Sequence, residues 1–149
     1  MTEIDRMSQE YAKKLKKALG HLRYSHKKIL RLPTAPSKLD EEQLETWESF
    51  SARFARVVDL FLTKYLRAVV LQDDPGFDGS LRDFVNQAEK IGLISSARRW
   101  MAIRELRHIT AHEYADEDLS GYFEQTRKLT GELLRVEKIL NQPRPRKKR

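Results

Sequence analysis

The chain has 149 residues, of which 40% are hydrophobic and 34% are charged. This is the size and composition of one globular domain with enough apolar residues to bury a core. The absence of cysteine excludes a disulfide framework, thiolate chemistry and zinc–thiolate sites. No apolar run approaches the roughly 20 residues of a membrane span. The first residues also lack the basic-then-apolar order of a signal peptide, so we expect a cytoplasmic protein.

The formal net charge of +7 is concentrated at the two ends of the chain. Residues 1–31 contain nine Lys or Arg against three acids, and residues 144–149 are almost all basic, whereas the part between them is net acidic. Basic surface favours polyanionic partners, but the same pattern also suits a solvated helix face and a free tail. We expect a folded domain over residues 1–142 and a basic flexible tail over residues 143–149.

The first predicted helix covers about residues 3–31, and Pro33 and Pro36 end it. Its apolar or near-apolar residues recur at steps of three or four, which indicates one buried face. These residues are Tyr11, Leu15, Leu19, Leu22, His26 and Ile29.

The second predicted helix begins after Asp40, which can cap it together with Gln43. It carries the strongest amphipathic signal in the chain. The turn-forming sequence over residues 73–76 ends this helix. Its predicted core residues are Trp47, Phe50, Phe54, Val57, Phe61, Tyr65 and Ala68.

Three further helices are predicted in the second half of the chain. A capping-box pattern from Ser80 to Asp83 opens a short helix to about residue 90. A fourth helix begins near residues 95–96, with its core at Ala97, Trp100, Met101, Ile103 and Leu106. The fifth follows the acidic residues 116–118, with its core at Leu119, Tyr122, Thr126, Leu129, Leu133, Val136 and Leu140. No strand pattern survives, so the predicted fold is an all-α antiparallel bundle of four to five helices with short loops.

One stretch at the end of the fourth helix concentrates the reactive side chains. Arg107, His108, His112 and Tyr114 lie within eight residues. A guanidinium binds phosphate in a bidentate manner, and an imidazole can transfer protons near neutral pH. Arg107 and His112 are five residues apart and therefore on different faces of a regular helix. They can converge only at a distorted helix end or through a second copy of the chain.

The spacing of these residues resembles the signature of the HEPN superfamily of helical ribonucleases. In that signature an arginine and a polar residue are followed, after three residues, by a histidine, and here these are Arg107, His108 and His112. With Tyr114 the pattern becomes Arg-x4-His-x-Tyr, which resembles the HepT toxins that are paired with a minimal nucleotidyltransferase (MNT) antitoxin. The likeness covers about residues 3–141.

The resemblance implies a homodimeric, metal-independent endoribonuclease toxin that cleaves tRNA or another RNA. It makes Arg107, His112 and His108 the catalytic candidates, and Tyr114 the residue to which the antitoxin transfers AMP. We expect no cofactor and no metal ion. The candidate RNA-binding residues are basic side chains of the fourth and first predicted helices: Arg98, Arg99, Arg104, Lys13, Lys14 and Lys17.

Three other interpretations stay open at the level of sequence. The chain can be a non-catalytic helical adaptor that presents substrate to a nucleotidyltransferase, or a basic nucleic-acid-binding protein without chemistry. His108 and His112 also have the i, i+4 spacing of metal ligands. However, Ile109 stands where the zincin pattern requires glutamate.

Overall fold

The computed structural model describes residues 1–108 and 116–142, and no strand occurs in this part of the chain. The predicted all-α helical bundle is therefore confirmed. The helices, in chain order, are α1 (Glu3–Ile29), the 3₁₀ turn η1 (Pro36–Lys38), α2 (Glu41–Asp59), the π-helical turn η2 (Leu60–Tyr65), α3 (Leu66–Asp73), α4 (Leu81–Lys90), α5 (Ala97–His108), α6 (Asp116–Leu134) and α7 (Val136–Asn141).

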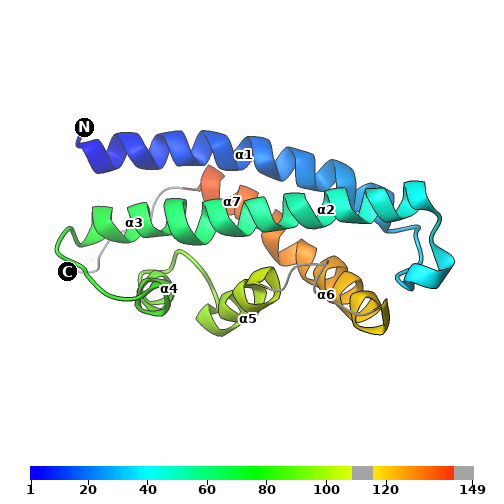
Figure 1. The fold of residues 1–149 in the computed structure, drawn as a ribbon. Coiled ribbons are helices and arrows are strands. Elements are labelled where there is room, and N and C mark those ends of the chain that lie inside the picture. The colour runs from blue at the N-terminus through cyan, green and yellow to red at the C-terminus, as the bar shows by residue number, and fades with distance from the viewer. Residues whose placement is uncertain (109–115, 143–149) are drawn as a thin grey trace.

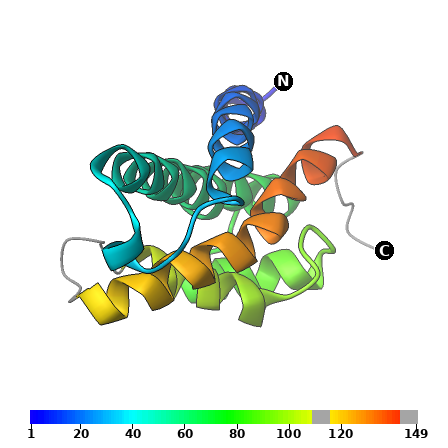
Figure 2. The same cartoon turned by 90° about the vertical axis from the view of Figure 1, so that its right-hand side faces the viewer.

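The helices form two crossing layers. In the first layer, α1 lies antiparallel to the long rod made of α2, η2 and α3 (Figure 1). In the second layer, α4, α5 and α6 pass beneath this pair and cross it steeply (Figures 1 and 2). The final helix, α7, turns back to α1, where Glu137 forms an ion pair with Arg23. The expected antiparallel packing thus holds for the long pair, whereas the later helices cross it.

Both helix starts predicted from capping boxes are confirmed. The side chain of Asp40 accepts a hydrogen bond from the backbone N–H of Gln43 at 2.8 Å, and the Gln43 side chain accepts one from the backbone N–H of Asp40 at 3.1 Å. Ser80 and Asp83 form the equivalent pair at the start of α4. Each box satisfies backbone N–H groups that the first turn leaves without partners, which stabilises a helix by about 1 kcal/mol.

The core is built on the aromatic residues predicted for the second helix, and all of its predicted positions are buried. Trp47 stacks on Phe123 of α6 with 4.5 Å between ring centroids. Phe61 packs on Trp100 of α5 at the same centroid distance. These two contacts attach the crossing layer to the α1–α2 layer. Phe123 is fully buried, although the predicted stripe of α6 did not include it.

Two predicted helices are interrupted in the structure. In the second, the backbone N–H of Leu66 donates to the carbonyl of Phe61, five residues back, which makes a π-helical turn. The inserted residue rotates α3, which α1 covers on one side and α4 on the other. The fifth predicted helix breaks at Arg135, and α7 then packs against α1. Apolar spacing does not report either break, because the side chains on both sides of each break are buried.

We expect Trp47→Ala to lower the free energy of unfolding by about 3–5 kcal/mol, because a large buried ring leaves a cavity. The change also removes the stacking on Phe123 and the 2.9 Å hydrogen bond from the indole N–H to the carbonyl of Pro33. Trp47→Phe, which keeps a ring, should lose clearly less. Urea unfolding followed by circular dichroism measures both variants, and equal losses would contradict the central role of the stacked ring.

Candidate functional site

The candidate site is centred on Arg107, in the last turn of α5, and Asp59, the last residue of α2. The guanidinium Nε donates to Asp59 Oδ1 at 3.1 Å and to Oδ2 at 3.2 Å, and Nη2 donates to Oδ2 at 2.9 Å. This is the bidentate geometry in which arginine binds planar anions. The pair fixes the guanidinium plane and leaves the Nη1 side of the fork outside these bonds.

The crossing of α5 over α2 explains why these two residues meet. Trp100 and Arg107 are seven residues apart, which is close to two helical turns, so they lie on one side of α5. Trp100 packs on Phe61 in the core. The helix α5 crosses the rod steeply (Figure 1). Two turns after Trp100, Arg107 pairs with Asp59, whose side chain is half exposed.

The backbone around Asp59 is held locally. Asp59 directly precedes the π-helical turn, and the hydroxyl of Thr63 donates to its carbonyl oxygen at 2.6 Å. A side chain that bonds into the helical ladder is a common companion of local distortion. π-helical turns are also frequent at functional sites. The Thr63 hydrogen bond thus helps to fix the backbone of the residue whose carboxylate binds Arg107.

The electrostatics of the site keep Arg107 charged. Hydrogen bonding to Asp59 raises the pKa of Arg107 above its ordinary value. Behind it, Tyr122 is buried, and burial raises the pKa of its phenol although the charge of Arg107 acts in the opposite direction. The Arg107 side chain is 31% exposed, so it can still contact a ligand. The result is a fixed cation at the surface, backed by a neutral phenol.

The rest of the predicted catalytic motif is only partly placed. His108 is the last residue of α5. His112 and Tyr114 lie outside the described residues, as does the predicted basic tail. The convergence of Arg107 with His112 therefore stays a prediction.

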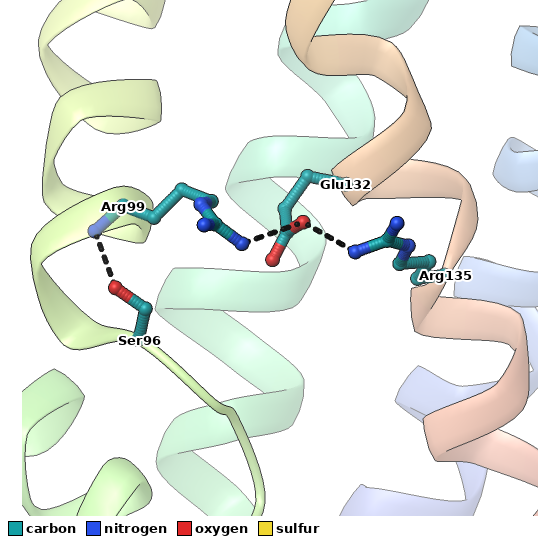
Figure 3. Close-up of polar contacts among 4 residues, drawn as sticks. All are labelled: Ser96, Arg99, Glu132 and Arg135. Atoms are coloured by element: carbon teal, nitrogen blue, oxygen red, sulfur yellow. Dashed lines mark hydrogen bonds and ion pairs between the residues drawn. The ribbon is translucent and has the colours of Figure 1, made fainter.

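The candidate RNA-binding residues of α5 do not share one surface. Arg98 is exposed, and its nine-residue separation from Arg107 places it on the opposite side of the helix. Arg99 forms an ion pair with Glu132 at 3.3 Å, and Glu132 also pairs with Arg135 (Figure 3). Arg104 is half-buried one turn before Arg107, on a neighbouring part of the surface. Of the three arginines, Arg104 alone adjoins Arg107.

The candidate lysines of α1 are all exposed, and two of them line a groove. Lys14 and Lys17 border a groove of about 460 Å³ between α1 and α2, which His21 and Arg56 also line. Lys13 is not among its lining residues. Lys14 additionally pairs with Glu10 on its own helix at 3.5 Å. The groove is therefore strongly cationic.

The exposed edge of α2 connects this groove to Arg107. Arg56 lines the groove, and Asp59 lies three residues further along α2, which makes the two surface neighbours. The sequence interpretation missed both residues. A signal for Asp59 was present, because it is the single charged residue in the otherwise apolar run of residues 57–62. A carboxylate in such a run usually has a partner.

No family model, no curated protein and no solved structure matches the chain. Within the described residues, no three His, Asp or Glu side chains gather as a metal site would require. No helix in the same part of the chain combines the length and apolar character needed to cross a membrane.

We expect a double-mutant cycle of Asp59→Ala and Arg107→Ala to show a coupling free energy of about 0.5–1 kcal/mol. The pair is bidentate, but both side chains are partly exposed, which limits its contribution. The exposed Glu10–Lys14 pair is a matched control and should couple by less, about 0.3 kcal/mol. Urea unfolding measures all variants. Absence of coupling would mean that the two side chains do not pair in solution.

Proposed function

We propose that the chain is a metal-independent endoribonuclease toxin of the HepT-like HEPN class, which acts in the cytoplasm as a homodimer on tRNA or another RNA. The observation that carries the proposal is the fixed, partly exposed Arg107 fork on Asp59. It stands directly before the segment that contains His112 and Tyr114. An arginine held in this way can bind phosphate, and His108 directly follows it in the sequence.

The proposed chemistry needs two proton transfers and one stabilising cation. His112 takes the proton of the ribose 2′-OH, and the 2′-oxygen then attacks the adjacent phosphorus. The bond from phosphorus to the 5′-oxygen breaks, and this oxygen receives a proton from a second imidazole. That imidazole is His108 or His112 of the partner subunit. The Arg107 N–H groups that Asp59 does not use neutralise the charge that develops on the phosphorane oxygens.

The distribution of charge supports a polyanionic substrate. An RNA strand bound at Arg107 can cross the edge of α2 at Arg56 and enter the groove bordered by Lys14 and Lys17. Each neutralised phosphate releases counterions, so binding through this surface weakens as salt increases. Arg104 adjoins the same route, whereas Arg98 faces away from it and Arg99 is paired with Glu132.

Regulation would act on Tyr114. In the proposed pair, an MNT-type nucleotidyltransferase antitoxin transfers AMP from ATP to the phenol oxygen of Tyr114, which loses its proton, and pyrophosphate leaves. The added group brings a negative charge and bulk close to His112 in the sequence. A negative charge near a phosphate-binding arginine repels the substrate or takes its place. The toxin would thereby be silenced at its catalytic face.

One observation favours a second candidate, the non-catalytic adaptor of a nucleotidyltransferase. Asp59 occupies the bidentate edge of Arg107, which is also what a purely structural ion pair does. In that case Arg107 anchors α5 to α2, and the basic surface holds the substrate of the partner enzyme. The two candidates differ in whether the chain cleaves RNA on its own.

We expect the purified wild-type chain to cleave total cellular RNA in the presence of EDTA. Arg107→Ala and His112→Ala should each reduce the rate by more than about 100-fold, because each removes a group acting in the transition state. Arg98→Ala is the matched control. It removes an exposed arginine from the opposite side of the same helix and should cleave like wild type. Gel electrophoresis of the RNA provides the rates.

The other candidates give different results in the same assay. If neither the wild type nor any variant cleaves RNA, and RNA is not bound, the ribonuclease proposal fails and the adaptor remains. If RNA is bound in a salt-sensitive way, without cleavage and without an effect of His112→Ala, the chain is a binding protein. Sedimentation at several concentrations tests the homodimer independently.

We expect co-expression with a small nucleotidyltransferase antitoxin to add the mass of one AMP to Tyr114. Intact-mass and peptide mass spectrometry would locate the group, and RNA cleavage by the modified chain should be lost. Tyr114→Phe, which lacks the acceptor oxygen, should stay unmodified and active. Modification at another tyrosine, or continued cleavage by the modified protein, would contradict this form of regulation.

A further inference from the structure

One tyrosine lies on the surface where core packing does not explain it. Tyr24 of α1 is 59% exposed, and no other Phe, Trp or Tyr among the described residues is largely exposed. A single exposed ring is ordinary on a protein surface. Tyr24 becomes informative through the cations and hollows that surround it.

Two cations of the protein lie against this ring. Lys28 Nζ is 4.9 Å from the ring centroid, and the Arg53 guanidinium carbon is 5.9 Å from it. Arg53 is held in place by hydrogen bonds from Nη1 to the carbonyl oxygen of His21 at 3.1 Å and to the hydroxyl of Ser25 at 2.7 Å. The ring and the guanidinium thus form a fixed pair that requires little ordering when a ligand binds.

Tyr24 stands between two hollows of different chemistry. A hollow of about 190 Å³ between α1 and α2 is lined by Tyr24 together with polar groups that include Glu45 and Ser49. An open hollow of about 540 Å³ on the other side is lined by Tyr24 with Lys27 and Arg31. Lys28 and Arg53 also line the first hollow. Its Glu45 carboxylate can accept a hydrogen bond from a base amino group. The charged residues that line the second hollow are all cations, which suits a phosphate.

The same face of α1 continues from Tyr24 to the groove beside the candidate site. Its exposed residues recur at steps of three and four, which places them on one side of the helix over about 21 Å: Lys14, Lys17, His21, Tyr24 and Lys28. Arg53 and Arg56 of α2 border this strip. A strand bound along it reaches the edge of α2 at Asp59 and Arg107.

We propose that Tyr24, Lys28 and Arg53 form a stacking site for an unpaired base of single-stranded RNA, whose backbone follows the strip towards Arg107. The choice of RNA rests on the proposed function. The preference for a single strand follows from the exposed ring, because an aromatic side chain stacks on bases that a duplex hides. An acidic peptide would use the cations but has no base to stack on the ring.

The test is fluorescence anisotropy with a short, labelled, single-stranded oligonucleotide that carries 2′-O-methyl groups. This probe cannot be cleaved through its 2′-oxygen, so binding is measured apart from catalysis. Tyr24→Ala should weaken binding about five- to tenfold, whereas Tyr24→Phe, which keeps the stacking face, should stay within about twofold of wild type. Lys28→Ala should weaken binding more than Lys138→Ala, a control at an exposed lysine of α7.

Two further probes decide between ligands. The duplex form of the same sequence should not respond to Tyr24→Ala, and neither should polyglutamate. The stacking site would be overturned if Tyr24→Ala bound the single-stranded probe as tightly as the wild type. It would also be overturned if the substitution weakened the binding of all three probes equally. If Tyr24-dependent binding is seen but natural RNA is never cleaved, the ribonuclease proposal fails and the stacking site stands. If natural RNA is cleaved but Tyr24→Ala binds the probe like wild type, only the stacking site is lost.

Discussion

The row of buried aromatic side chains along α2 and η2 is the constraint on which the rest of the structure depends. Trp47 and Phe61 each pack against a ring of the crossing layer, Phe123 of α6 and Trp100 of α5. Aromatic burial is a large favourable contribution, and ring pairs add geometric preference to it. The two contacts therefore hold α5 and α6 against a rod that α1 already covers on another side.

This packing also creates the candidate site. The contact of Phe61 with Trp100 packs α5 onto the rod, and two turns later Arg107 forms its hydrogen bonds with the partly exposed Asp59. The arginine is thus fixed by a carboxylate that lies outside the core and next to a π-helical turn. The same edge leads to the cationic groove between α1 and α2. One continuous surface joins the proposed phosphate clamp to the strip around Tyr24.

The ion pair with Asp59 has two opposing effects on Arg107. It orders the guanidinium, and it also uses some of the N–H groups that could bind a ligand. A bidentate carboxylate occupies one edge of the fork and leaves the other N–H groups for a ligand. In a partly exposed site the attraction between the two charges is modest. The same exposure screens the repulsion between the Asp59 carboxylate and a phosphate bound as proposed. In a non-catalytic adaptor, the ion pair would only need to anchor α5 to α2. The ribonuclease and the adaptor therefore share this geometry and differ in whether RNA is cleaved.

Much of the fold was accessible from the sequence, because helix spacing and caps are local signals. The predicted core residues from Trp47 to Ala68 are all buried, and the capping boxes at Asp40 and Ser80 form as expected. The π-helical turn and the break at Arg135 were not accessible. The apolar pattern runs through both of them, since buried residues continue on either side.

The features of the candidate site also fall into those that the sequence determines and those that depend on tertiary structure. The sequence by itself determined that the chain is helical, that its first helix is basic, and that arginine, histidines and tyrosine gather within residues 107–114, because composition and spacing are properties of the chain alone. Only the tertiary structure decided that Asp59 holds Arg107, that Arg99 pairs with Glu132, and that Arg53 meets Tyr24. Each of these depends on how helices distant in sequence cross, and local periodicity carries no information about crossing.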